Sequence, residues 1–418
     1  MDFTTSIFGD FAKFRYGKMP KKSSVKENGK YPIYSGYRYV GYYDEYNTEA
    51  NQLIIVARGV GGTGDVKLTK EKCYLTNLSI SVEIDTSIAL PEYLYYCFSI
   101  RNLRYLDSGS AQSQITISDL ARVEIPLPNI EIQKKIVHCL GVLDRKISAN
   151  KAINDNLEQQ AQALFRKWFI DSSDRSQWKS GTFSDIIMST LNGDWGKEYP
   201  SGNNIKKVYC VRGADIPDVK AGNKGKMPTR YILPKNYAIK KLETGDIVVE
   251  ISGGSPTQST GRCTAITQSL LDRYDSGMVC TNFCKAIKPL SGYSMFAYYY
   301  WQYLYDKGVF FSYENGTTGI KNLDFSGFLE TEPITLPPFE RIADFDAYCQ
   351  TNFDQIFANG KQSEQLSLLR DALLPELCPA SWMSLPSSFK PLNYHLAFKK
   401  EVRLVLCLKP KCLTTNPL

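Results

Sequence analysis

The chain has 418 residues, a formal net charge of +7 at pH 7, a sequence pI near 8.7 and eleven cysteines. This length exceeds one ordinary domain and suits two or three, and the modest positive charge allows a polyanionic partner only at local patches. The cysteines are scattered and only two histidines accompany them, so we expect neither a disulfide framework nor a zinc site, but free, buried thiols in a reducing compartment. No apolar run approaches the roughly 20 residues of a membrane span, and the N-terminus lacks a signal-peptide pattern, so we expect a cytoplasmic protein.

Residues 1–128 are predicted to form a first domain in which strands dominate. They are rich in short Val, Ile, Tyr and Thr runs separated by Gly, Asn and Pro, as in YPIYSGYRYVGYYDEY at 31–46. A long helix is expected next, at 129–170, because Pro126 and Pro128 favour an extended backbone immediately before it.

The second half of the chain follows the same plan. Residues 171–338 predict a second strand-rich domain, and Pro337 and Pro338 precede a second helix at 339–375. Residues 376–418 show neither repeat nor periodicity. The fold class that this order indicates is α+β, with two mixed, strand-rich domains joined by two long helices.

An internal repeat supports this plan. Residues 127–164 and 336–373 align without a gap at an offset of 209 residues. Upstream, Phe3 with Gly9-Asp10 resembles Trp178 with Ser184-Asp185, and LIIVARGVGG resembles DIVVEISGG. Because the first helix leaves the first domain and the second helix must return from the second, we expect antiparallel helices and a pseudo-two-fold internal repeat.

Apolar residues recur along the first helix at spacings of four and three, as in a coiled coil. Asn150 and Asn154 lie on this seam, where a buried polar pair lowers stability but fixes the register. A solvated hinge in a frayed helix is the alternative. The predicted seam consists of Ile136, Leu140, Leu143, Ile147, Asn150, Asn154, Leu157, Ala161, Leu164 and Trp168, with Ile356, Leu366 and Leu373 on the second helix.

Several segments resemble the specificity subunits of type I restriction-modification systems (HsdS-like proteins), over residues 1 to about 377. They are YPIYSGYRYVGYYDEY, SGSAQSQITISDL at 108–120, IPLPNIEIQKKIV at 125–137, and LDRKI followed by LEQQAQALFRKWF. The resemblance implies that each strand-rich domain is a target recognition domain for one part of a split site in double-stranded DNA. It also implies that the helices are spacers around which two methyltransferase subunits bind.

The same resemblance implies that endonuclease and translocase subunits complete the complex. S-adenosylmethionine, ATP and magnesium are then held by these partner subunits. No catalytic residue, cofactor or metal is expected in this chain.

Candidate DNA contacts lie in polar loops that mix basic and amide side chains with glycine. Arg and Lys suit guanine edges and phosphates, and Asn and Gln suit adenine. An ordinary solvated surface residue is the alternative for each one. The candidates are Arg38, Arg58, Lys67, Asn77, Gln112, Ser113 and Gln114 in the first domain, and Lys224, Lys226, Ser255, Gln258, Arg262 and Lys321 in the second.

Other motifs are interpreted as structural. GVGGTG at 59–64 fits a dinucleotide-binding pattern, but the DVKLTKEKCYLT that follows offers no helix N-terminus for a pyrophosphate. LPPF at 336–339 resembles a methyltransferase tetrapeptide, but Leu336 stands where Asn or Asp is needed. The tyrosine-rich stretches YRYVGYY and FAYYYWQYLY are assigned mainly to packing.

The end of the chain departs from the family pattern, in which LLP-x-L is followed by MSGELDV. Here LLPEL at 373–377 is followed by CPASWMSLPSSFK. Possible codons for Cys378 to Ser384, shifted by one base, would encode the missing ending. We therefore expect residues 378–418 to be frameshifted coding sequence.

Two functions of other classes remain open at this stage. One is a free-standing, two-domain DNA-binding scaffold or regulator whose helices dimerise. The other is a fused methyltransferase, which ranks last because neither a cofactor loop nor a catalytic tetrapeptide is found in the sequence.

Overall fold

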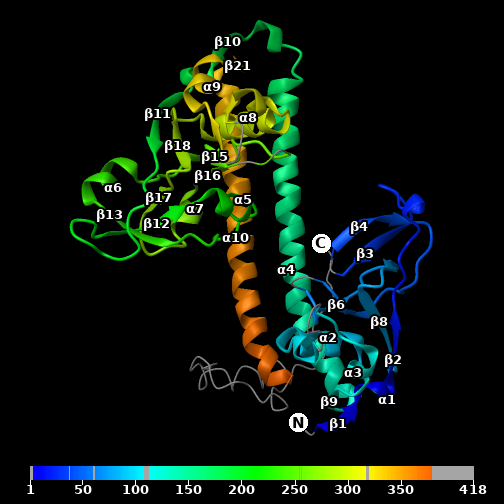
Figure 1. The fold of residues 1–418 in the computed structure, drawn as a ribbon. Coiled ribbons are helices and arrows are strands. Elements are labelled where there is room, and N and C mark those ends of the chain that lie inside the picture. Colours follow the sequence, from blue (N-terminus) through cyan, green and yellow to red (C-terminus); the bar gives the residue numbers. More distant parts are fainter. Residues whose placement is uncertain are drawn as a thin grey trace, which may run out of the picture. The chain divides into compact units, whose positions relative to one another are not determined.

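The computed structural model describes residues 3–36, 38–59, 62–107, 113–253, 255, 257–316 and 320–378. The chain divides into two compact units (Figure 1). Unit 1 comprises residues 1–145 and 367–418, and unit 2 comprises residues 146–366. No helix in the described part of the chain is long and apolar enough to cross a membrane.

Unit 1 contains three small sheets. In the first sheet, β1 (Thr4–Ile7) pairs antiparallel with β9 (Glu124–Leu127). The second sheet has four antiparallel strands, in the spatial order β2 (Ala12–Tyr16), β8 (Ser79–Ile84), β5 (Leu53–Val56) and β6 (Val66–Leu68). In the third sheet, β3 (Tyr31–Ser35) pairs antiparallel with β4 (Arg38–Tyr43) and parallel with β7 (Tyr74–Leu75). The helices are α1 (Phe8–Phe11), α2 (Pro91–Ile100), α3 (Ile117–Ala121) and the first part of α4 (Ile130–Phe165), with 3-10 turns at Lys22–Ser24 and Leu103–Leu106.

The apolar run in β5 is buried on both faces of its sheet. Successive strand residues point to opposite faces, so Leu53 and Ile55 join the main core of unit 1, whereas Ile54 packs with Cys73 and Leu75 under the third sheet. The run therefore serves two cores at once, which explains why it is apolar without alternation.

Unit 2 repeats the sheets of unit 1 in the same order. The pair is β10 (Lys179–Thr182) and β21 (Pro333–Leu336); the four-stranded sheet is β11 (Ile187–Asn192), β18 (Cys284–Pro289), β14 (Ile247–Glu250) and β16 (Cys263–Ala265). The third sheet has β12 (Lys206–Val211) between β13 (Thr229–Ile232) and a parallel β17 (Met278–Cys280). Unit 2 adds a sheet of β15 (Ser252–Gly253), β20 (Lys321–Leu323) and β19 (Glu314–Asn315).

The helices of unit 2 surround a larger aromatic core. They are α5 (Ile216–Lys220), α6 (Pro234–Lys240), α7 (Gln268–Leu271), α8 (Ser294–Asp306), α9 (Phe325–Thr331) and most of α10 (Phe339–Leu377), with 3-10 turns at Arg175–Gln177, Phe183–Asp185, Gly213–Asp215 and Val309–Tyr313. Nine residues of α8 are buried, Trp301 among them. The packing role predicted for FAYYYWQYLY is confirmed, whereas Tyr39 in the other tyrosine-rich stretch is 50% exposed.

Strand registers confirm the predicted internal repeat. Thr4 lies opposite Leu127 in unit 1, and Lys179 lies opposite Leu336 in unit 2. The match of Phe3 with Trp178 makes Thr4 equivalent to Lys179, and the offset of 209 residues makes Leu127 equivalent to Leu336, so the two pairs correspond. The α+β fold class with a repeated domain and two long helices is therefore the observed one.

The long helices run antiparallel, and the contacts between them obey the repeat. Within unit 2, Asn150 Nδ2 donates to Ser363 Oγ (3.2 Å) and Asn359 Nδ2 donates to Asn154 Oδ1 (2.9 Å). Asn359 is the repeat equivalent of Asn150, and Ser363 is that of Asn154. Each pair is thus the pseudo-symmetric copy of the other, as in an isologous interface. Because Asn150 and Asn154 are buried, the solvated-hinge alternative is wrong.

The coiled-coil spacing holds only for the first part of α4. Beyond Asn154 the buried residues are Ala161, Phe165 and Phe169, four apart at the end, whereas Leu164 and Trp168 are half-buried. Phe165 packs against Phe345 of α10 and also against aromatic side chains of α8, and a π-helical turn covers Arg166–Ile170. The helix therefore turns a different face inward where it meets the core of unit 2.

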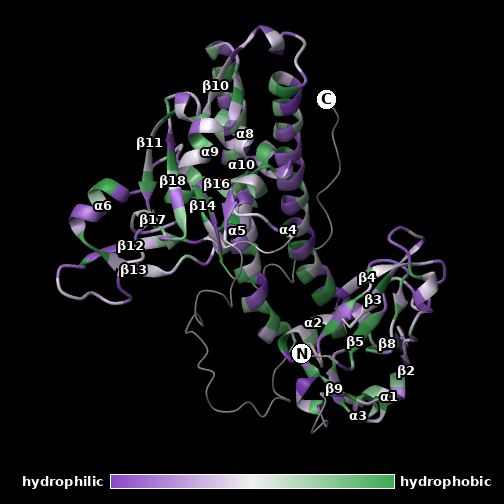
Figure 2. Ribbon diagram, turned by 45° about the horizontal axis from the view of Figure 1, so that its top comes forward, coloured by the Kyte–Doolittle hydropathy of each residue, from purple (hydrophilic) through white to green (hydrophobic). Residues whose placement is uncertain are grey.

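Burial along the predicted seam is uneven. Hydrophilic and hydrophobic residues alternate along α4 and α10 (Figure 2). The buried seam residues are Ile136, Leu140, Asn150, Asn154, Ala161, Ile356 and Leu373, and the half-buried ones are Leu143, Ile147, Leu157, Leu164, Trp168 and Leu366. Gln133 is fully buried, and the apolar periodicity did not predict this. Its side-chain amide accepts from the Leu90 N–H and donates to the carbonyls of Ile88 and Pro128, so it is buried by hydrogen bonding and not by apolar packing.

Candidate nucleic-acid interface

Two loops meet at one edge of unit 1. The first follows β5 and runs from Gly59 to Gly64; both glycines have positive φ (+138° and +88°), which side chains rarely adopt. The second loop ends at Gln114, which forms an isolated antiparallel bridge with Arg58. The Asp107 carboxylate fixes this loop, accepting from the backbone N–H of Gln114 (2.8 Å) and from the Ser113 hydroxyl.

The corresponding edge of unit 2 has the same framework. Gly253 and Gly261 open and close the first loop with φ of +143° and +96°. The partner strand β20 pairs with β15, so that Ser252 lies opposite Asn322, and the Ser252 hydroxyl donates to Asn322 Oδ1 (2.6 Å). No helix follows the glycine loop in either unit; strands β6 and β16 do. This arrangement agrees with the rejection of a dinucleotide-binding role for GVGGTG.

The structure brings together most of the candidates predicted in the first domain. Arg58 is exposed, and its backbone N–H bonds to Leu78 O (3.2 Å), in the turn that holds the half-buried Asn77. Arg38 is exposed at the start of β4, next to a turn whose Gly36 approaches the Arg58 carbonyl. Lys67 is exposed in β6, three residues beyond Gly64. Gln112 lies outside the described residues.

Two candidates of the second domain are engaged in ion pairs. Arg262 forms a bidentate pair with the buried Glu250 carboxylate (2.8 and 2.7 Å), which raises the pKa of Arg262. Lys321 donates to Glu314 (2.7 Å), and the N–H of Thr260 donates to the other oxygen of that carboxylate (2.6 Å). Burial opposes ionisation of Glu314, but these hydrogen bonds lower its pKa. Both cations therefore hold loops in place within the protein.

The other candidates of unit 2 divide between two loops. Ser255 and Gln258 lie in the glycine loop, where the Ser255 N–H bonds to the Gln258 carbonyl (2.7 Å). Lys224 and Lys226 lie in a separate loop after α5; Lys224 Nζ sits 4.9 Å from the centre of the Tyr274 ring, and the Lys226 side chain is exposed.

Sequence reasoning missed Ser252 and Asn322. A signal existed for Ser252, because matching Gly59 of LIIVARGVGG with Gly253 of DIVVEISGG places Ser252 on Arg58. The position of Asn322 depends on which strand pairs with β15, and no local pattern indicates that.

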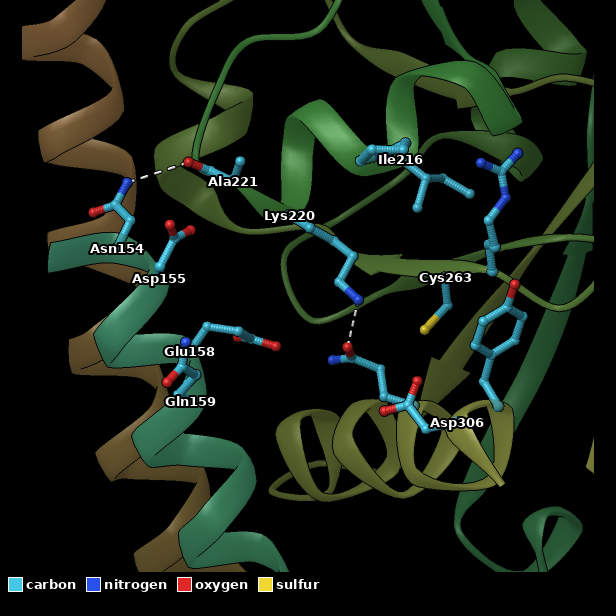
Figure 3. A pocket seen from close by; sticks show the side chains of 13 residues that line it. Asn154, Asp155, Glu158, Gln159, Ile216, Lys220, Ala221, Cys263 and Asp306 are labelled. Carbon is cyan, nitrogen blue, oxygen red and sulfur yellow. Dashed lines mark hydrogen bonds between the residues drawn. The ribbon is translucent and has the colours of Figure 1, made fainter. Parts of the chain in front are cut away.

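A cavity of about 460 Å³, lined mostly by polar residue types, lies between α4, α5, β16 and α8 of unit 2 (Figure 3). Lys220 reaches into it and donates to Gln302 Oε1 (2.5 Å), and Asn154 Nδ2 donates to Ala221 O (3.2 Å) at its edge. Burial raises the pKa of the Cys263 thiol to about 12, so this thiol is a poor nucleophile. Among the described residues, no cluster of three or more His, Cys, Asp or Glu side chains could hold a metal ion.

The repeated α+β units, their matching loop pairs and the two antiparallel helices define a two-unit scaffold. Residues 2–159 match the family model described as the type I restriction modification DNA specificity domain. The chain is 28% identical over 314 residues to the type I restriction enzyme MjaIX specificity subunit of Methanocaldococcus jannaschii, covering 68% of each. A shorter match, 35% identical over 96 residues, covers 22% of this chain and 21% of the type I restriction enzyme HindI specificity subunit of Haemophilus influenzae.

A solved structure has a similar fold. The type I restriction-modification system S subunit from M. genitalium aligns with a TM-score of 0.61 and 18% identity, over 90% of this chain and 96% of that one. Over about two thirds of its length, the chain is similar to type I restriction-modification specificity subunits. Members of this family are non-catalytic, and catalytic activity lies with partner subunits.

Proposed function

We propose that the chain recognises a split DNA site and holds the methyltransferase and endonuclease subunits of a type I complex on its paired helices. One observation carries this proposal: the two units present the same loop framework, Gly59 to Gly64 with Gln114 and Gly253 to Gly261 with Asn322. Two copies of one reading framework in a single chain suit a site with two separate parts.

Adding the discrimination of two DNA-recognising units explains how individually modest base contacts can make the chain specific for one DNA sequence. Each bidentate contact to a base edge discriminates by about 1–3 kcal/mol, and contacts at separated base pairs add roughly independently. We propose that the helix pair sets the gap between the two parts of the site, since α4 alone has 36 residues, or about 54 Å at 1.5 Å per residue.

The chemistry is assigned to the partners. S-adenosylmethionine, ATP and magnesium would be bound by the methyltransferase and endonuclease subunits, in the cytoplasm. This chain would supply DNA recognition and geometry.

A map of methylated adenines tests the proposal. Genomic DNA from cells with the gene and its methyltransferase partner is compared with DNA from cells that have the partner alone. We expect a split motif with a fixed gap that disappears without this chain. Unchanged methylation would contradict the proposal. Specific DNA binding without stable copurification of the methyltransferase would favour a free-standing regulator.

A further inference from the structure

We propose that four equivalent side chains read bases: Arg58 and Gln114 in one half-site, Ser252 and Asn322 in the other. This inference rests on the proposed function and deepens it. It assigns a different task to Arg262 and Lys321, which position the loops and do not read DNA.

The equivalence rests on backbone bonds that recur in both units. Ile115 N–H donates to Ala57 O (2.9 Å), and Leu323 N–H donates to Ile251 O (2.8 Å). These bonds place Gln114 and Asn322, the preceding residues, at the same point of the framework.

The glycine loops close in the same way. Gly64 N–H donates to Val56 O (2.9 Å), and Gly261 N–H donates to Glu250 O (2.8 Å). Arg58 therefore corresponds to Ser252, since each stands two residues beyond the strand residue that closes its loop.

Two of these side chains, Arg58 and Asn322, have unused donors. Within the described part of unit 1, the exposed Arg58 guanidinium has no ion-pair or hydrogen-bond partner, in contrast to Arg262. Asn322 is exposed and accepts the Ser252 hydroxyl on Oδ1, and its Nδ2 group has no hydrogen-bond partner among the described residues. A guanidinium matches the O6 and N7 acceptors of guanine, and an amide matches the edge of adenine.

Ion pairs beneath these residues hold the second-unit loops in shape. The Glu250 carboxylate lies under Gly253, where an added Cβ would stand 3.1 Å from Glu250 Oε1. Glu314 ties Thr260, near the end of the glycine loop, to Lys321 in β20. If a cation paired with a buried carboxylate moved to DNA, it would leave a buried charge without its partner, which is strongly unfavourable.

Single substitutions in the full-length chain, assembled with its methyltransferase, test the assignment. Arg58→Lys keeps the charge but loses the bidentate fork, so it should relax one base pair in the first half of the motif only. Asn322→Ala should relax one base pair in the second half only. Relaxation is measured as methylation of single-mismatch sites relative to the cognate site, and we expect it to rise roughly 5- to 140-fold.

Matched exposed positions serve as controls. Arg122→Lys at the end of α3 and Asn203→Ala in the turn before β12 should leave both halves of the motif unchanged. Copurification with the methyltransferase and the thermal unfolding midpoint are measured for every variant. Asn322→Ser keeps a polar side chain and replaces the alanine variant if that one does not assemble.

The outcomes separate this inference from the proposed function. A split motif that stays unchanged in Arg58→Lys and Asn322→Ala, or that relaxes equally in both halves, overturns the inference and leaves the function standing. Absence of any methylation dependent on the wild-type chain overturns the function itself. Relaxation confined to opposite halves supports both.

Discussion

Burial controls the chemistry of the thiols, residue by residue. Eight of the nine cysteines in the described residues are buried, and all nine are free, as the scattered spacing predicted. Burial raises the pKa of the Cys73, Cys210 and Cys263 thiols to about 12. Cys139 on α4 is half-buried and its pKa is raised for the same reason.

We predict that iodoacetamide at pH 8 modifies Cys139 much faster than Cys73, Cys210 or Cys263, because only the thiolate reacts. The same pKa shifts make stability depend on pH. Since the folded thiol pKa values exceed the unfolded value near 8.5, the native state binds more protons than the unfolded state between pH 8.5 and 12. The free energy of unfolding should therefore fall as pH rises through that window, by about 1.4 kcal/mol per pH unit for each buried thiol. Peptide-resolved mass spectrometry and urea unfolding at pH 8 and 10 check both parts, with Cys139→Ser as the labelling control. Equal labelling of all four thiols would contradict this account.

At the scale of elements, the antiparallel helix pair depends on a buried amide cluster. Asn359 Nδ2 donates to Asn154 Oδ1 (2.9 Å), and Asn154 Nδ2 donates to Ile356 O (3.0 Å). Removing one amide leaves its partner buried and unsatisfied, which costs about 1–3 kcal/mol.

We therefore predict that Asn359→Ala lowers the free energy of unfolding of unit 2 by about 1–3 kcal/mol, measured by urea titration. Asn156→Ala, an exposed site on α4, should change it by less than about 0.5 kcal/mol. Similar effects of the two substitutions would show that the amide cluster does not hold the helices.

Elements were predictable where a local signal sets them. Proline pairs mark the starts of both long helices, and the offset of 209 residues locates the repeat. The inward face of α4 beyond Asn154 was not predictable, because it depends on α8, an element more than a hundred residues away. Periodicity reports one helix at a time, whereas packing chooses the face that matches its neighbours.

The candidate site follows the same rule. Arg58 and Gln114 were predicted because basic and amide residues stand out in glycine-rich loops. Arg262 and Lys321 were predicted for the same reason, yet their charges are taken by Glu250 and Glu314. An ion pair across two strands leaves no mark in the local sequence, so composition alone overestimates the available cations.

At the scale of the whole molecule, unit 1 is built from both ends of the chain. Leu373, Leu374 and Leu377 of α10 are buried in the core of residues 8–143, against Ile136 and Leu140 of α4. Arg370 also pairs with Asp144 (2.9 Å), whose second oxygen accepts the Tyr96 hydroxyl (2.7 Å). The first domain is therefore complete only when the second long helix returns to it.

A chain that ends after Leu366 should consequently lose the stability of unit 1 and retain that of unit 2. The three leucines contribute about 1.5–3 kcal/mol each, and their sum rivals the 5–15 kcal/mol of a whole domain. Hydrogen exchange followed by mass spectrometry should show faster exchange in β5 and β8 and unchanged exchange in β14 and β18. A chain that ends after Cys378 keeps all three leucines and should retain protection in both units. Uniform loss of protection across the four strands in the shorter chain would mean that the two units fold as one.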